Sequence, residues 1–276
     1  MPPPKKKPAV KNLPLAVVPT ERLVRADAPS TGTALVPVNP TPQAIVTQEN
    51  VARITGYAYR TANHVLPDAM VFYVDPHLRR SVVNRGEADK IAWQDPETGF
   101  ECIVLRDPDK RYLRGFVGIP PSHPLYGYSH DAIPTDLGLE VHGGLTYGKA
   151  CEVPAQRETW VRGEALRICH TTIRPMVRKL VAGTNATDHK AHDDAWWLGF
   201  DCCHPGDLVP RRHPSRVIDG VRPVYRDDDY VVSEVLHLAA QLQAIELGVP
   251  MPVRPGPPLS PMSLQPESTQ ERGDRK

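Results

Sequence analysis

The sequence lacks any long apolar run and carries almost no net charge. No stretch reaches the roughly 18 consecutive apolar residues that a membrane-spanning helix needs, so a membrane span is not expected. The formal net charge is +1, which gives no bulk electrostatic reason to bind nucleic acid or an anionic membrane. Aromatic residues make up only 6% of the chain, and no basic stripe accompanies them. We therefore expect a small-molecule or peptide ligand, whereas no pattern indicates the oligomeric state.

Cysteines are few and irregularly spaced. The chain has 5 of them, an odd number with no Cys-x-x-Cys pair. The early apolar stretch at residues 13–18 is too short and too interrupted by proline for a secretory signal. A disulfide scaffold is therefore not expected, and the sequence predicts a cytoplasmic protein with reduced thiols.

Several nucleotide-binding and hydrolase motifs are also missing. The sequence has no Walker A motif and no Gly-x-Gly-x-x-Gly, which argues against a phosphate-cradling ATPase or a dinucleotide enzyme. It has no Gly-x-Ser-x-Gly elbow either. His142-Gly143-Gly144 is therefore not expected to be the oxyanion loop of an α/β-hydrolase.

Proline, by contrast, is abundant, with 31 residues. Residues 1–48 combine a proline run, the triplet Lys5-Lys6-Lys7 and no hydrophobic periodicity, and residues 249–276 are rich in Pro and Ser. Such segments bury too little apolar surface to offset the entropy of ordering. The sequence predicts two disordered tails around a single domain at 49–248, with its best-defined core at 100–247.

Between these tails the hydrophobic pattern predicts short strands and one long helix. The helix is expected from the acidic residues Asp227–Asp229 to Leu247, because its apolar residues recur at intervals of three and four and Gly248 follows. Asp107-Pro108-Asp109-Lys110 has the composition of a turn that joins two strands into a hairpin. The predicted fold class is α+β, with a small mixed or antiparallel sheet and a C-terminal packing helix. The expected strands are 69–74, 101–106, 112–119, 139–142, 166–170 and 196–201.

Polar groups with possible chemistry follow the apolar run Trp196–Phe200. If strands 139–142 and 196–201 are neighbours, His142 and Asp201 lie at strand ends, with His204 and Asp207 on the loop beyond. Two imidazoles and a carboxylate suit zinc or another divalent metal that activates water. The sequence thus favours a metal-dependent hydrolase whose predicted metal ligands are His142, Asp201 and His204. The predicted catalytic residues are His142, Asp201, His204 and Asp207.

Other interpretations of these residues stay open. In a metal-free site, His142 or His204 would be a general base oriented by Asp201 or Asp207. In a purely structural interpretation, Asp201 caps a turn and the histidines bind backbone carbonyls. The protein would then be a non-enzymatic binding or interaction protein. Its pocket would recognise a ligand or hold a closed structural zinc. The alternative zinc ligands are Cys151, Cys169, His170 and either Cys202 or Cys203.

A rigid loop and a glycine pair are the predicted substrate-binding walls. Prolines fix the backbone around His123 and Tyr126 in the segment 120–127. Gly143 and Gly144 lack Cβ atoms and so allow a ligand or another backbone to approach closely. His170 is the remaining predicted substrate contact.

Five sequence blocks carry a resemblance to a known family. Together they resemble an uncharacterised family of bacteriophage and bacterial, notably actinobacterial, proteins, over about residues 100–245. The resemblance implies a phage-encoded or prophage-derived chain working in the host cytoplasm, and it implies no particular activity. The blocks are Gly115-Phe116-Val117-Gly118-Ile119-Pro120, His123-Pro124-Leu125-Tyr126-Gly127, Val141-His142-Gly143-Gly144-Leu145-Thr146-Tyr147, Ile168-Cys169-His170 and the run from Trp196 to Asp207.

Overall fold

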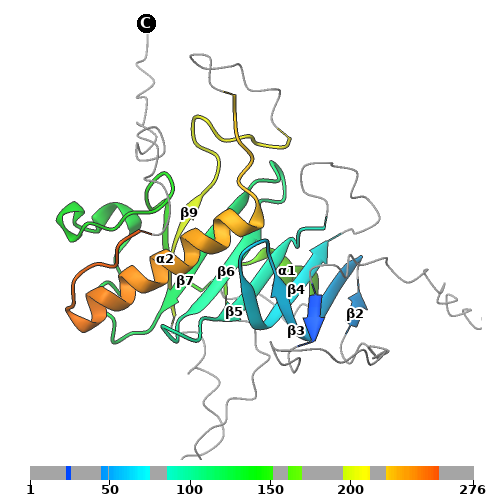
Figure 1. The fold of residues 1–276 in the computed structure, drawn as a ribbon, viewed down its shortest axis with the longest axis horizontal. Coiled ribbons are helices and arrows are strands. Elements are labelled where there is room, and N and C mark those ends of the chain that lie inside the picture. The colour runs from blue at the N-terminus through cyan, green and yellow to red at the C-terminus, as the bar shows by residue number, and fades with distance from the viewer. Residues whose placement is uncertain are drawn as a thin grey trace, which may run out of the picture.

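A single antiparallel sheet with a long helix across one face makes up the fold (Figure 1). The computed structural model describes residues 23–25, 45–48, 50–74, 86–151, 161–169, 195–211 and 222–254. The predicted α+β class, with an antiparallel sheet and a C-terminal packing helix, is confirmed. The sheet is larger than expected, because it has nine strands in the described ranges.

Strand order follows chain order through the middle of the sheet. The order is β1-β3-β4-β5-β6-β7-β9-β8, and β2 also pairs with β3. Consecutive hairpins build β3 to β7, whereas β9 arrives from a distant part of the sequence and inserts between β7 and β8. The bounds are β1 Leu23–Arg25, β2 Ile45–Gln48, β3 Val51–Arg60, β4 Val65–Val74, β5 Lys90–Gln94, β6 Glu101–Arg106, β7 Leu113–Ile119, β8 Tyr147–Ala150 and β9 Trp196–Asp201.

The hairpin of β6 and β7 is confirmed. Its register pairs Ile103 with Phe116. The turn forms because the Asp107 carboxylate accepts hydrogen bonds from the backbone N–H groups of Asp109 and Lys110, at 3.1 and 2.7 Å. The predicted strands at 69–74 and 196–201 are also present, as part of β4 and as the whole of β9.

Helix α2, Asp228–Leu247, is the predicted C-terminal helix. Asp227 caps it by accepting a hydrogen bond from the Tyr230 N–H, and Gly248 ends it in the left-handed conformation. Its buried apolar side chains pack on β6 and β7. Gly115 of β7 permits this close approach, because a Cβ there would lie only 2.5 Å from Val235 Cγ2.

The opposite face of the sheet carries a second helix and a separate apolar cluster. Helix α1, Val161–Leu166, packs on β3 and β4, with Ala165 fully buried. Trp197 and Phe116 centre the other cluster on this face. The expectation of a strand at 166–170 is wrong for residues 166–169, since Leu166 ends α1 and no strand follows it, while His170 lies outside the described residues.

The predicted strand at 139–142 is also wrong, because the neighbour of β9 is β8. The backbone N–H and C=O of Glu140 bond to the side-chain amide of Gln241 on α2, at 2.7 and 2.9 Å. These backbone groups are therefore satisfied by a helix rather than by a strand. Residues 130–132 and 135–137 form two short 3-10 turns before this segment.

Two short strands lie within the range 1–48, where the sequence predicts a tail. Strand β1 pairs with Tyr57–Tyr59, and β2 pairs with Val51–Ile54, so both extend the sheet beside β3. The remaining residues of both predicted tails, except 249–254, lie outside the described residues. Among the described helices, none has the length and apolar content to cross a membrane.

Candidate functional site

The candidate site lies where two turns meet the N-terminal half of α2. Residues 141–144 form one turn, closed by the Gly144 N–H and the Val141 carbonyl at 3.0 Å. Residues 204–207 form the other, closed by the Asp207 N–H and the His204 carbonyl at 3.0 Å. Asp207 also pairs with Val224 in an isolated bridge, which brings the chain leading into α2 beside the second turn.

A continuous chain of hydrogen bonds connects four side chains at this place. His142 Nε2 lies 2.7 Å from Asp207 Oδ2, and His142 Nδ1 lies 2.9 Å from the Tyr230 hydroxyl. Arg226 Nε donates to the other carboxylate oxygen, Asp207 Oδ1, at 2.9 Å. We call these four side chains, Tyr230, His142, Asp207 and Arg226, the Tyr230 relay.

The direction of the relay follows from the charge of Asp207. Burial raises the pKa of this carboxyl, but hydrogen bonds from His142 and Arg226 outweigh that effect, and the pKa ends below its usual value. Asp207 is therefore ionised and only accepts hydrogen bonds. The His142 tautomer that donates from Nε2 to this carboxylate accepts at Nδ1, and the Tyr230 O–H then donates to it.

Tyr230 and Arg226 form the more accessible end of the relay. The side chains of His142 and Asp207 are 0% and 1% exposed, whereas that of Arg226 is 22% exposed and Tyr230 is half-buried. Burial and the nearby Glu234 carboxylate raise the pKa of the Tyr230 phenol, against the effect of Arg226. The Arg226 guanidinium lies over the Tyr230 ring, 4.7 Å from its centroid. Tyr230 is thus a protonated hydroxyl beside a cation.

His204 supports the relay by packing. Its ring stacks on the ring of His142 with the centroids 5.4 Å apart, and its backbone N–H donates to Asp207 Oδ2 at 2.9 Å. Gly143 makes room for it, because a Cβ at Gly143 would lie 1.7 Å from His204 Nε2. The predicted close approach at Gly143 is therefore made by a side chain of the protein.

A second ion pair flanks the relay on α2. Glu234, one helical turn after Tyr230, accepts a hydrogen bond from the backbone N–H of His142 at 3.1 Å. Its other oxygen pairs with the Arg254 guanidinium. Arg254 reaches this place because the chain reverses after Gly248 and runs back beside α2 (Figure 1).

Three of the four predicted catalytic residues, His142, His204 and Asp207, lie together at this site.

Asp201 does not join them, because it lies on the opposite face of the sheet. Position 115 faces α2, its register partner Phe200 packs beside it, and side chains alternate along a strand. Asp201 consequently points away from α2, where its carboxylate lies 4.0 Å from Arg114 Nε. Burial raises the pKa of Asp201, and Arg114 only partly offsets this.

The predicted substrate-binding loop is attached to α2 through His123. Its Nε2 lies 2.9 Å from the Leu242 carbonyl, and its Nδ1 accepts from the Leu125 N–H at 3.0 Å. Both ring nitrogens are engaged and the residue is 3% exposed, which indicates a structural role. Tyr126 packs on Trp196 with ring centroids 5.9 Å apart. Gly144 has open space at its Cβ position, and His170 lies outside the described residues.

The cysteines of the alternative zinc site are divided between the two faces of the sheet. Cys151 and Cys169 share the apolar cluster around Trp197, and the Trp197 indole N–H donates to Cys151 Sγ at 3.1 Å. Cys202 belongs to the cluster under α2. Cys203 is half-buried and bonds to the Tyr112 hydroxyl. The described residues therefore do not assemble this set of ligands.

The predicted metal ligands His142, Asp201 and His204 do not fit a metal ion in this arrangement. Both nitrogens of His142 and both oxygens of Asp207 are occupied by hydrogen bonds, and Asp201 faces away. Within the described ranges, no group of three or more His, Cys, Asp or Glu side chains is placed to hold a metal. The relay is instead a closed series of hydrogen bonds that runs from a half-buried hydroxyl to a buried carboxylate.

Sequence reasoning missed four residues of this site: Arg226, Tyr230, Glu234 and Arg254. Tyr230 and Glu234 are one helical turn apart, a spacing visible in the sequence, but that spacing does not reveal which loop turn of the protein they contact.

A scan against models of protein families and searches of curated proteins and of solved structures find no match. The resemblance to a phage and bacterial family stays a prediction.

Proposed function

We propose that the protein is a hydrolase in which Tyr230 exchanges protons with substrate and water, backed by His142 and Asp207. The observation that carries this proposal is the unbroken hydrogen-bond chain from the half-buried phenol to the buried carboxylate. A hydroxyl, an imidazole and a carboxylate in series are the components of many hydrolytic sites, with the carboxylate fixing the imidazole tautomer. The proposed proton transfer uses side chains that are all present in the chain.

The proposed step begins with a water molecule next to Tyr230. Water attacks the electrophilic centre of the substrate and gives one proton to the Tyr230 oxygen, while the phenolic proton moves to His142 Nδ1. Asp207 stabilises the imidazolium that forms. The same proton then returns through Tyr230 to the leaving oxygen, so that the bond to the leaving group breaks and all groups regain their starting state.

The raised pKa of Tyr230 keeps its phenol protonated across the neutral range. Such a phenol is a weak acid on its own, so it passes a proton on only in a concerted exchange, in which it receives one proton as it gives up another. Arg226 contributes a fixed positive charge beside it, which stabilises negative charge on a substrate oxygen in the transition state. His142 and Asp207 are positioning residues, because their burial keeps them from touching substrate.

A binding protein without catalysis is the second candidate function. It is favoured by the complete burial of His142 and by the engagement of both of its ring nitrogens, since a structural histidine has the same features. The two candidates differ in what loss of the Asp207 charge does. In a hydrolase this loss reduces turnover, whereas in a binding protein it changes only stability or ligand affinity.

The test is an assay of the full chain and of Asp207→Asn against 4-nitrophenyl acetate, 4-nitrophenyl phosphate and bis(4-nitrophenyl) phosphate. The carboxamide cannot stabilise the imidazolium, so we expect kcat to fall by about 100-fold or more on any substrate that the intact chain hydrolyses. His130→Gln, at an exposed histidine outside the relay, is the matched control and should be unchanged. Absence of turnover on all three substrates, or full activity of Asp207→Asn, would contradict the proposal.

A further inference from the structure

Arg254 holds hydrogen-bond donors that have no acceptor in the protein. Its side chain is 14% exposed, and its Nη2 pairs with Glu234. Its Nε and Nη1 atoms are buried and find no hydrogen-bond partner among the described residues. Leaving a buried donor without a partner is costly, and more so when it belongs to a charged group. A bound water molecule or anion that supplies the acceptor would satisfy these atoms.

Arg226 presents further donors at the same place. Its Nε donates a hydrogen bond to Asp207, and in the described part of the chain its two Nη groups make no hydrogen bond. Its side chain is 22% exposed, so these groups are accessible from outside the relay. Each arginine therefore uses one side of its guanidinium to hold a carboxylate and leaves other N–H groups to meet something else.

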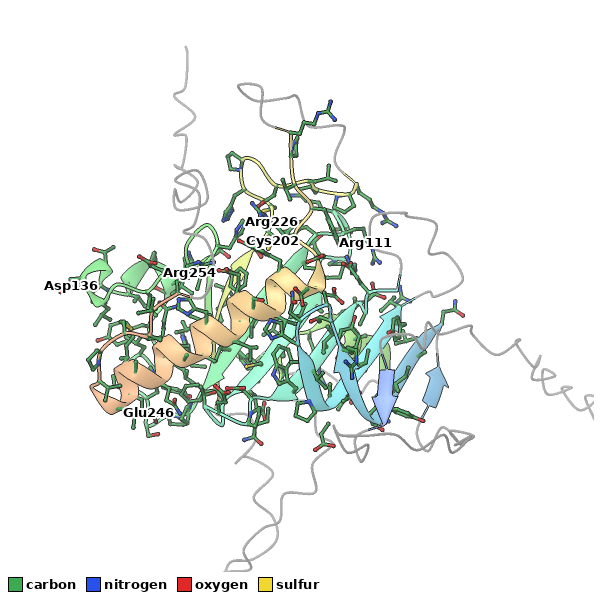
Figure 2. The ribbon with its side chains drawn as sticks, in the orientation of Figure 1. Arg111, Asp136, Cys202, Arg226, Glu246 and Arg254 are labelled. Atoms are coloured by element: carbon green, nitrogen blue, oxygen red, sulfur yellow. The ribbon has the colours of Figure 1, made fainter. Side chains whose placement is uncertain are left out.

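Tyr230 is connected to both arginines. The Arg226 guanidinium lies over its ring, 4.7 Å from the centroid, and its hydroxyl contacts His142, whose backbone N–H donates to the Glu234 carboxylate that pairs with Arg254. Figure 2 shows Arg226 and Arg254 along the same edge of α2, with Arg254 nearer the C-terminal end of the helix. His142 connects them, since it bonds to Asp207 through its ring and to Glu234 through its backbone N–H.

The charges of this place explain what kind of ligand it suits. Asp207 and Glu234 balance Arg226 and Arg254, so the four groups carry no net charge. An anion is then attracted mainly by directed N–H donors, not by an excess of positive charge. Two guanidinium groups offer planar sets of N–H donors from two side chains, which matches a group with three or more acceptor oxygens better than a two-oxygen carboxylate.

We propose that Arg226 and Arg254 bind a phosphate group of the substrate next to Tyr230. This inference rests on the proposed function, because it assigns the substrate class of that site as phosphate-bearing molecules. The phosphate oxygens accept hydrogen bonds from the unfilled donors of Arg254 and from the outer donors of Arg226. A phosphate held by Arg226 lies beside Tyr230, because the guanidinium is 4.7 Å from the centroid of the Tyr230 ring.

The experiment is isothermal titration of the full chain with inorganic phosphate, with acetate as the second probe. We expect phosphate to bind with an affinity at least about tenfold higher than that of acetate. Each additional charged hydrogen bond contributes about 1.5–3 kcal/mol, and 1.5 kcal/mol corresponds to about a tenfold difference in affinity. Arg254→Gln should weaken phosphate binding at least tenfold, and so should Arg254→Lys, which keeps the charge beside Glu234 but loses the planar donors. Arg222→Gln, at an exposed arginine, is the matched control and should bind as the intact chain does.

Circular dichroism of each variant shows whether it is folded. If Arg254→Gln does not fold, the binding measurement on Arg254→Lys tests the inference. Absence of phosphate binding to the intact chain would overturn the inference, and so would equal binding by folded Arg254→Lys. Phosphate binding without hydrolysis of any ester would support the anion site and contradict the hydrolase. Hydrolysis of 4-nitrophenyl acetate without phosphate binding would support the hydrolase and overturn the anion site.

Discussion

Two networks of buried polar groups meet the N-terminal half of α2, and they differ in how far their hydrogen bonds are used up. One is the Tyr230 relay. The other, which we call the Arg106 cluster, consists of Arg106, Glu87, Asp89 and Tyr225. Arg106 is 1% exposed, and its guanidinium contacts both carboxylates, the Tyr225 hydroxyl and two backbone carbonyls.

The Arg106 cluster binds only other parts of the protein. The Nη2 atom of Arg106 donates to Glu87 at 2.7 Å, and its Nε atom lies 3.3 Å from Asp89. Tyr225 donates to Glu87 at 2.7 Å, and the Asp228 N–H at the start of α2 approaches the same carboxylate at 3.3 Å. These contacts join the residues before β5, strand β6 and the start of α2. Arg106 Nε makes no hydrogen bond to the described residues, but it is buried and paired with the Asp89 carboxylate, so it does not face outwards. This is what a network that only stabilises the fold looks like.

The Tyr230 relay differs because its outer end, Tyr230 and Arg226, is partly exposed and retains unused donors. Both networks contain an arginine, a carboxylate and a tyrosine, so composition alone does not separate them. Exposure and unfilled hydrogen-bonding capacity do. We therefore expect changes in the Arg106 cluster to reduce stability and changes in the relay to reduce function.

The largest expected effect on stability is that of Arg106→Met. It leaves the buried Glu87 carboxylate without its cation and removes one of the two arginines beside Asp89, so the free energy of unfolding should fall by about 3–5 kcal/mol in urea titrations. Arg222→Met, at an exposed arginine, should change it by less than about 0.5 kcal/mol. A loss below about 1 kcal/mol for Arg106→Met would remove the contrast between the two networks.

Lys90 extends the comparison to the other face of the sheet. It is fully buried, donates to the carbonyls of Glu164 and Arg167 at 2.7 and 2.8 Å, and burial lowers its pKa to about 8. An unfolded lysine titrates near pH 10.4. Between these two values the unfolded chain binds more protons, so the free energy of unfolding should rise with pH.

The measurement is the free energy of unfolding at pH 7 and pH 10 for the intact chain and for Lys90→Met. The intact chain should gain about 2 kcal/mol more than the variant over this interval. Other titrating groups are common to both proteins and cancel in the difference. An equal change with pH in both proteins would show that Lys90 does not titrate with a lowered pKa.

Gly143→Ala tests how tightly the relay is packed. The new Cβ would lie 1.7 Å from His204 Nε2, and the residue has a φ of 67°. Gly144→Ala is the matched control, because it has a similar φ of 83° but nothing within 4 Å of its Cβ. Both variants carry the backbone strain of about 1 kcal/mol. Gly143→Ala should lose about 1–2 kcal/mol more in unfolding experiments, and equal losses would contradict the close packing.

The smallest expected effect concerns the helix that both networks share. Asp227 accepts a hydrogen bond from the Tyr230 N–H at 3.0 Å, so Asp227→Ala should cost about 1 kcal/mol of stability. The exposed Asp136, which makes no cap hydrogen bond, provides the control Asp136→Ala with a change below about 0.5 kcal/mol. Equal stability of Asp227→Ala and the intact chain would argue against the cap.

The sequence predicted best what depends on neighbouring residues. The turn at Asp107 and the capped helix from Asp227 both follow from local hydrogen bonds and spacing, and both are present. The strand expected at 139–142 is absent, because the side chain of Gln241, a hundred residues away, accepts the hydrogen bond of the Glu140 backbone N–H. No local pattern contains that information.

The candidate site was predicted in part for the same reason. His142, His204 and Asp207 come together although the reasoning relied on a strand that is absent, because the turn at 141–144 still meets the turn at 204–207. Asp201 was misplaced because strand alternation directs it to the face opposite α2. Arg254 was missed because its position depends on the chain reversing beside α2.

The most direct test of the account is a paired measurement on Tyr230→Phe, which removes only the hydroxyl at the outer end of the relay. Turnover of the best substrate and the free energy of unfolding are measured on the same preparation, with Tyr128→Phe, at an exposed tyrosine, as the control. We predict that kcat falls by about 100-fold or more while stability changes by no more than about 1.5 kcal/mol. Unchanged turnover, or a loss of activity explained entirely by unfolding, would contradict the assignment of the relay as a functional site.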